Sequence, residues 1–225
     1  MLKRLLETLA FFKAFIREIV WFLVPVTFPI LLLETMVASR VMETEAAGLG
    51  FWLPFGINFL FRPVYTGGLI WLISGLASGQ ERSFGECLST GLRFWIDLLA
   101  VYIISTVIIF TGLLVLIIPG LIFFARLSLA EFGVVLEKMS PGQALLRSNN
   151  RVKGFTAEII SYTIILTFLL VSTDIIINYA LSVFSIQGLG ARMLTSMVFM
   201  VLSSTLTIMF YRFYDLALKK EMGIS

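Results

Sequence analysis

The stretch "LLAVYIISTVIIFTGLLVLIIPG", residues 98–120, decides the fold. From Leu98 to Ile118 it carries no charged side chain. About 20 apolar residues, each rising 1.5 Å along a helix, are enough to cross a hydrocarbon core about 30 Å thick. Pro119 and Gly120 follow at once, and this pair is typical of a helix end and a tight turn. The stretch therefore predicts a transmembrane helix that ends in a turn.

The composition of the whole chain agrees with this prediction. Of its 225 residues, 59% are hydrophobic and 14% are charged, whereas soluble domains average about 45–50% and about 25%. The mean hydropathy is +0.98. The chain has one cysteine, Cys87, and no histidine, so an internal disulfide is excluded and the commonest general base and metal ligand are missing. We expect an all-α integral membrane protein with no metal and no cofactor, and the composition argues against a protease, a lipase or a haem subunit.

Five further apolar segments join the first one to give six predicted spans. Residues 1–225 are expected to form a single integral membrane domain, and Pro25 and Pro29 should kink the first span. Lys13, Arg17 and Glu18 interrupt the apolar run near the N-terminus, which favours an uncleaved anchor over a signal peptide. The predicted spans are residues 19–38, 51–78, 98–118, 121–137, 157–184 and 193–218.

The basic residues between the spans predict an orientation. Nearly all the Lys and Arg residues outside the spans fall on the side of both termini, and only Arg40 and Arg192 fall on the other side. Because Lys and Arg are enriched in cytoplasmic loops, we expect both termini to lie in the cytoplasm.

Two polar stretches between the spans are similar to each other. "SFGECL" at 83–88 and "SPGQAL" at 140–145 share Ser, Gly and Leu, and one predicted hairpin lies between them. Each stretch begins an amphipathic segment, which predicts interfacial helices over 83–97 and 140–155, with a third over 1–18. These features predict parallel internal repeats, each made of a surface helix and two spans. Chance similarity over six positions is the alternative.

The serine that begins each stretch predicts the start of a helix. Ser83 with Glu86, and Ser140 with Gln143, have the spacing of a capping box. The chain has no histidine, and the sequence shows no general base that would pair with Ser140 or Ser148 and make it a nucleophile. We expect these serines to be structural.

A group of basic side chains predicts a surface that binds lipid or a partner. No acidic residue occurs between residues 138 and 157, and each basic charge near an anionic membrane surface contributes about 1 kcal/mol. The alternative is that these residues only set the topology. The predicted surface consists of Lys138, Arg147, Arg151, Lys153 and Arg93.

Charged residues inside the apolar spans form a second candidate site. An unpaired charge in the bilayer costs a few kcal/mol or more, so such residues usually face a polar cavity or one another. They predict either a cavity for a lipid headgroup or coupled ion, or a structural network, with Arg126–Asp174 and Arg62–Glu34 as the candidate pairs. The polar cluster consists of Glu34, Arg62, Arg126, Glu131 and Asp174. Gly75 and Gly79, in GxxxG spacing, also predict a close helix contact.

The stretch "IPGLIFFARLSLAEFGVVLEKMSPGQALLRSNNRVKG", residues 118–154, carries a family pattern. Its features are Ile118-Pro119-Gly120, Arg126-Leu127, Glu137, Ser140-Pro141, Ala144-Leu145, Ser148 and Lys153-Gly154. With this pattern the chain resembles the YciC-like bacterial inner-membrane proteins, and it is similar to the membrane domain of some glycerophosphodiester phosphodiesterases. The pattern covers about a sixth of the chain, and Asn149-Asn150 departs from it. The resemblance implies a six-span inner-membrane domain without a catalytic centre of its own.

The expected function follows from these observations. We expect a non-enzymatic scaffold or partner subunit in envelope or lipid-related processes of the bacterial inner membrane. Its cytoplasmic face would bind anionic headgroups, a protein partner or a second copy of the chain. The alternative is a small transporter or lipid-translocating protein that uses the intramembrane charges. The sequence has no nucleic-acid-binding pattern.

Overall fold

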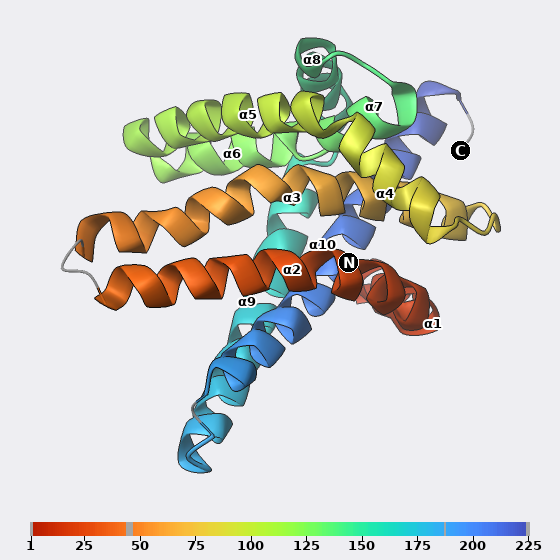
Figure 1. Ribbon diagram of the computed structural model, residues 1–225. Helices are drawn as coiled ribbons and strands as arrows, with labels where there is room; N and C mark the ends of the chain where they lie inside the picture. Colours follow the sequence, from red (N-terminus) through yellow and green to blue (C-terminus); the bar gives the residue numbers. More distant parts are fainter. Residues whose placement is uncertain (1, 44–46, 187, 224–225) are drawn as a thin grey trace.

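The computed structural model describes residues 2–43, 47–186 and 188–223, and across these ranges the chain is helical and contains no strand (Figure 1). Six segments within these ranges are long and apolar enough to cross a membrane. The prediction of an all-α, multi-pass membrane protein is confirmed. The helices are α1 (Leu2–Ala14), α2 (Ile16–Glu43), α3 (Ala47–Ala77), α4 (Phe84–Arg93), α5 (Trp95–Val115), α6 (Ile117–Leu127), α7 (Ala130–Glu137), α8 (Pro141–Val152), α9 (Thr156–Val183) and α10 (Leu189–Glu221).

The third and fourth spans differ in detail from their predictions. Helix α5 ends at Val115, and the turn falls at Leu116 rather than at Pro119–Gly120. Pro119 instead lies in the first turn of α6. Backbone N–H groups in the first turn have no partner within the helix, so a proline is tolerated there. The fourth span is divided into α6 and α7 at Ser128 and Leu129.

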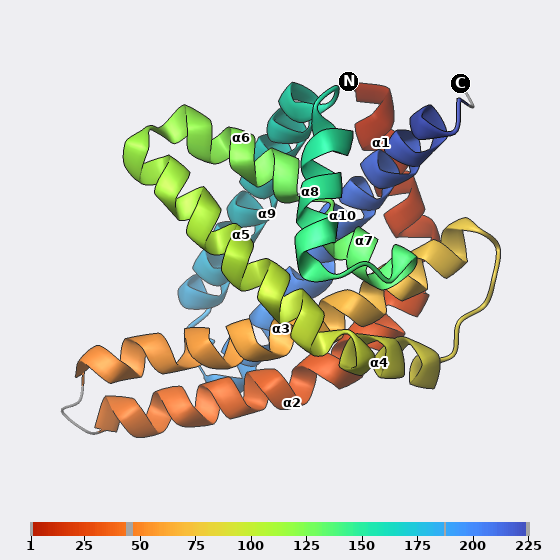
Figure 2. The ribbon, with the colours of Figure 1, turned by 90° about the horizontal axis from the view of Figure 1, so that it is seen from above.

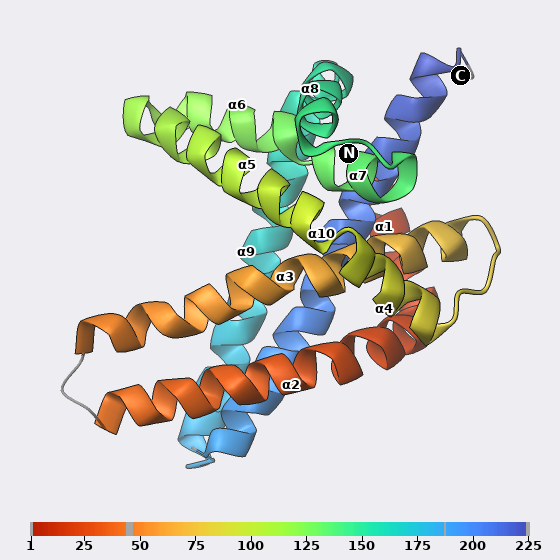
Figure 3. The ribbon, with the colours of Figure 1, turned by 45° about the horizontal axis from the view of Figure 1, so that its top comes forward.

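The membrane-length helices pair into three antiparallel hairpins. These are α2 with α3, α5 with the α6–α7 segment, and α9 with α10. Figures 1 and 3 show α1, α4 and the end of α10 toward the right and α8 at the top, and we call this part of the molecule the terminal side. The hairpin turns point away from them, toward what we call the tip side. The hairpins spread apart there, and the α9–α10 hairpin crosses the other two at a steep angle (Figures 1 and 3).

Each short helix packs on the second half of a hairpin. Helix α4 contacts α3, α8 contacts α6 and α7, and α1 contacts α10 (Figure 2). These helices are shorter than predicted: α1 ends before Phe15, α4 ends at Arg93, and α8 ends at Val152. Their buried side chains join two apolar clusters near the terminal side, one around Phe132 and Tyr214 and the other around Phe22.

Glycines bring α4 and α3 into direct backbone contact. A Cβ atom on Gly91 would lie 2.0 Å from the backbone oxygen of Val64, and one on Gly68 would lie 2.7 Å from the backbone oxygen of Cys87. Both distances are far below van der Waals contact, so only glycine fits. The GxxxG prediction placed the close contact at Gly75 and Gly79. It is wrong in position, because Gly79 lies after the end of α3 in a turn with φ +70°.

The two predicted capping boxes have different outcomes. The backbone N–H of Glu86 donates to Ser83 Oγ at 3.3 Å, and the Ser83 N–H donates to the Glu86 carboxylate at 2.9 Å, so the first box is confirmed. Ser140 precedes α8 with Pro141 at the first helical position, but its side chain makes no capping hydrogen bond. The predicted capping box of Ser140 with Gln143 is therefore wrong.

Candidate functional site: a polar cavity between the hairpins

A cavity of about 710 Å³ lies where the three hairpins spread apart. Its walls come from α2 and α3, from the α6–α7 segment, and from α9 and α10. All of these are membrane-length segments. The cavity therefore lies within the part of the protein that is long and apolar enough to cross the bilayer.

Polar residues at helical spacing line this cavity on three of its helices. Residues three, four or seven apart share a helix face, and each of these helices turns one such face to the cavity. Most of the polar residues are hydroxyl-bearing, and this face contrasts with the apolar side chains exposed elsewhere on α9. The lining residues are Asn58, Arg62, Tyr65 and Thr66 on α3, Thr163, Thr167 and Asp174 on α9, and Ser196, Ser203, Ser204 and Thr207 on α10.

Four of the five predicted intramembrane charges meet at this cavity. They are Glu34, Arg62, Glu131 and Asp174. Among the described residues none of them takes part in an ion pair, so the predicted Arg62–Glu34 pair is absent from that part of the chain. One cationic and three acidic side chains thus share a polar space without neutralising one another by contact.

The arginine is held in place by an aromatic ring. The guanidinium carbon of Arg62 lies 5.0 Å from the centre of the Tyr102 ring, within the range of a cation–π interaction. Arg62 remains exposed, and among the described residues it forms no ion pair. Tyr65, one turn further along α3, lines the same cavity.

Two buried polar atoms at the cavity have no hydrogen-bond partner among the described residues. They are Oε1 of Glu34 on α2 and Oγ1 of Thr163 on α9. A buried polar atom without a partner costs about 1–3 kcal/mol. A bound ligand or water would satisfy both atoms.

Arg126 does not belong to this cavity. It lies at the end of α6 and is not among the lining residues. Within the part of the chain that the structure describes, its buried Nε has no hydrogen-bond partner. The predicted pair with Asp174 is absent among the residues that the structure describes. The prediction failed because Arg126 and Asp174 were matched by depth along their helices, which says nothing about which way each helix is turned.

The predicted basic surface is also changed, because Arg151 is buried. Its side chain is 2% exposed and forms a two-point contact with Glu137 and another with Glu221, with Nη2 donating at 2.9 and 3.0 Å. The Tyr214 hydroxyl donates to the same Glu137 carboxylate at 2.7 Å. Burial acts to lower the pKa of Arg151, but the two carboxylates outweigh it and raise that pKa above its ordinary value. Arg151 therefore joins α7, α8 and α10 and is not available to lipid.

The other members of the basic surface remain accessible. Arg93, Lys138 and Lys153 are exposed. Arg147 is 51% exposed and donates to Glu221 at 3.1 Å. The predicted surface is reduced to these four residues, one of which is already paired.

Ser148 has a structural role in the same region. Its hydroxyl donates to the backbone oxygen of Arg126 at 2.7 Å and accepts from the backbone N–H of Leu129 at 3.1 Å. These bonds bridge the break between α6 and α7, where backbone groups lose their helical partners. Ser148 therefore fixes α8 against the divided fourth span.

The chain matches no protein-family model, no curated protein and no solved structure. Among the described residues, no cluster of His, Cys, Asp and Glu side chains has the geometry of a metal site. The class of the protein therefore follows from its own fold: it is a helical, multi-pass membrane protein with a polar cavity between three hairpins.

Proposed function

We propose that this protein binds the polar headgroup of a membrane lipid in the central cavity and moves it across the bilayer. The observation that carries the proposal is a cavity lined by four charged side chains that form no ion pairs with one another. Charges kept in apolar spans are costly and mark substrate pathways in membrane proteins. A headgroup would occupy the polar space, while its acyl chains would remain in the lipid between the spread hairpins.

The charges lining the cavity favour a headgroup that carries both signs. The Arg62 guanidinium suits a phosphate, to which it donates two parallel hydrogen bonds. Glu34, Glu131 and Asp174 favour a cationic group, and the hydroxyls of α9 and α10 suit the remaining oxygens. A phosphoethanolamine-type headgroup supplies a phosphate and an ammonium on one small group, whereas a purely anionic headgroup would face three carboxylates.

The proposal is tested with purified protein in lipid vesicles. The vesicles contain a trace of tail-labelled fluorescent phosphatidylethanolamine or phosphatidylglycerol, and a membrane-impermeant reductant is added outside. We expect the protein to expose inner-leaflet phosphatidylethanolamine to the reductant faster than phosphatidylglycerol. If vesicles with protein lose only their outer-leaflet fluorescence, as protein-free vesicles do, translocation is refuted.

The location and orientation form part of the proposal. We place the protein in a bacterial inner membrane with both termini in the cytoplasm. The distribution of Lys and Arg along the chain and the position of α1, α4 and α8 on the terminal side support this orientation. We propose no catalytic role, in keeping with a chain that has no histidine.

We also infer that three repeated units build the cavity, each made of a short helix and the hairpin that follows. Two observations support the inference. Cys87 and Gly91 of α4 are buried, as are Ala144 and Ser148 at the matching positions of α8. Each short helix also packs on a neighbouring hairpin: α4 on the α2–α3 hairpin, α8 on the hairpin of α5 with α6–α7, and α1 on the α9–α10 hairpin. Three hairpins in a ring leave a space at their centre, where the polar cavity lies.

A second candidate function rests on the exposed basic residues of the terminal side. Arg93, Lys138 and Lys153 are exposed and form no ion pair among the described residues. They suit attachment to anionic lipid or to an acidic partner of a membrane scaffold. In this role the protein would move no lipid, so vesicles that lose only their outer-leaflet fluorescence would favour it.

A further inference from the structure

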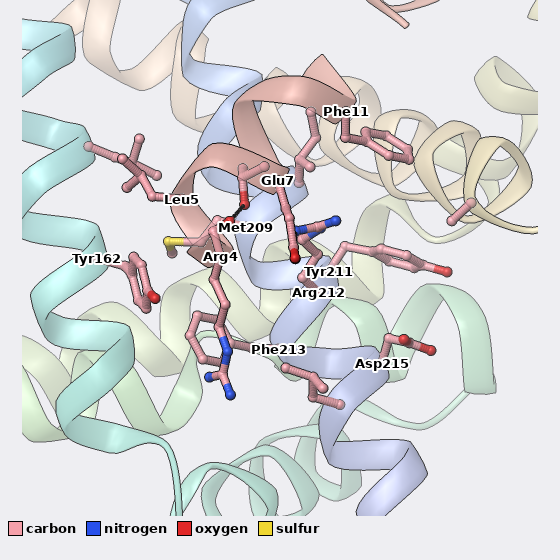
Figure 4. A pocket seen from close by; sticks show the side chains of 15 residues that line it. Arg4, Leu5, Glu7, Phe11, Tyr162, Met209, Tyr211, Arg212, Phe213 and Asp215 are labelled. Carbon is pink, nitrogen blue, oxygen red and sulfur yellow. Dashed lines mark hydrogen bonds and ion pairs between the residues drawn. The ribbon is translucent and has the colours of Figure 1, made fainter. Parts of the chain in front are cut away.

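A second cavity lies near the terminal side, between α1, α9 and α10 (Figure 4). Its volume is about 370 Å³. Figure 4 shows Arg4 and Glu7 reaching into it from α1, with Tyr162 on α9 and Arg212 and Asp215 on α10 around it. Two cationic and two acidic side chains thus line a space whose other walls are largely apolar.

Helix α1 forms one wall of this cavity and is fastened by two ion pairs. Arg4 contacts Glu158 of α9, and Arg212 of α10 donates to Glu7 at 2.8 Å. The Arg4 guanidinium also lies 6.0 Å from the centre of the Phe213 ring. All four ion-pairing side chains are one third to one half exposed, so each pair is weak by itself. Phe15 alone separates α1 from α2, so α1 is joined to the rest of the protein by a short connection.

The second cavity adjoins the central one. Leu166, Ile208 and Met209 line the second cavity, while Thr167 and Thr207, each next to one of them in sequence, line the central cavity. The same turns of α9 and α10 therefore wall both spaces.

We propose that the second cavity is a terminal-side binding site for the same phosphoethanolamine-type headgroup, and that α1 is the element that closes it. This inference rests on the proposed function, because it assigns the second cavity to the same path. The Arg4 and Arg212 guanidiniums would receive the phosphate, and Glu7 or Asp215 the ammonium. Arg4, Glu7 and Arg212 also form the ion pairs that fasten α1, so headgroup binding and closure would involve the same side chains.

Cysteine labelling tests the site without any lipid movement. Ala77 lines this cavity and is exposed, so Ala77→Cys reports access to it for a water-soluble thiol reagent in detergent. Burial raises the pKa of the native Cys87 thiol to about 11, which keeps its background labelling low. The matched control is Ser89→Cys, on the exposed side of α4 and away from this cavity. We expect soluble glycerophosphoethanolamine to slow labelling of Ala77→Cys but not of Ser89→Cys, and equal rates with and without it would overturn the site.

Charge reversal tests the closing role of α1. Glu7→Arg and Arg212→Glu, each in the Ala77→Cys background, should raise the labelling rate by up to about five-fold, the largest effect of one exposed ion pair. The double variant restores the pair with the charges exchanged, and its rate should return toward that of the parent. Single variants that label at the parent rate would overturn the closing role.

The two proposals fail separately. Protection of Ala77→Cys in a protein that moves no lipid would refute translocation and leave the site standing. Lipid movement without protection of Ala77→Cys would overturn the second binding site and leave translocation standing.

Discussion

Replacing Arg151 by methionine should lower the free energy of unfolding by about 3–5 kcal/mol, the range for removing one partner of a buried ion pair. The side chain of Arg151 is 2% exposed and holds the Glu137 and Glu221 carboxylates together. Without it, the Glu137 carboxylate, which also accepts from the Tyr214 hydroxyl, loses its cation, and Glu221 keeps only the half-exposed Arg147. The loss is measured as the shift in denaturant-induced unfolding in detergent micelles.

Arg147→Met is the matched control, because Arg147 lies one turn away on the same helix and contacts the same Glu221. Arg147 is 51% exposed, and an exposed ion pair contributes about 0–1 kcal/mol. The two methionine variants should therefore differ by at least about 2 kcal/mol. Equal losses would show that the Arg151 network does not stabilise the protein.

Gly91→Ala should detach α4 from α3 and destabilise the protein by roughly 1–3 kcal/mol, the usual effect of overpacking. The added Cβ would lie 2.0 Å from the backbone oxygen of Val64 and 3.2 Å from the backbone nitrogen of Gly68. Backbone atoms cannot rotate away as a side chain does, so the whole of α4 must shift. Thermal unfolding in detergent measures the effect.

Gly85→Ala provides the comparison on the same helix. A Cβ atom there meets nothing within 4 Å, and alanine favours a helix over glycine by roughly 0.5–1 kcal/mol. This variant should be as stable as the parent or slightly more stable. If both alanine variants behave alike, the close contact between α3 and α4 is not what holds α4 in place.

The spans could be predicted from the sequence because their length is set by the bilayer and their ends by charge. The positions of turns were harder to predict. Pro119 is compatible with the first turn of a helix as well as with its end, and hydropathy does not distinguish the two. The division of the fourth span depends on Ser148, which bonds to the backbone of Arg126 and Leu129 from another helix. No local pattern reveals such a contact.

The charges of the central cavity could be found from the sequence, but its hydroxyls were missed. A charge within an apolar run is conspicuous, whereas Ser and Thr are common in such helices and often bond to their own backbone, as Ser203 and Thr173 do. The signal that was available is the spacing of Thr163, Thr167 and Asp174 along one face of α9. The partners of Arg151 were missed for a different reason: Glu221 is 70 residues away in the chain, and only the packed fold brings it close.

The central claim is that the cavity between the hairpins receives the transported headgroup, and Arg62→Gln in the vesicle assay tests it most directly. Arg126→Gln is the control, because Arg126 is also an arginine within a membrane-length segment but does not line the cavity. A hydrogen bond to a charged group contributes about 1.5–3 kcal/mol, so the account predicts that Arg62→Gln slows movement of phosphatidylethanolamine at least about tenfold. Arg126→Gln should keep the parent rate. Equal rates for the two variants, with both folded, would contradict the account.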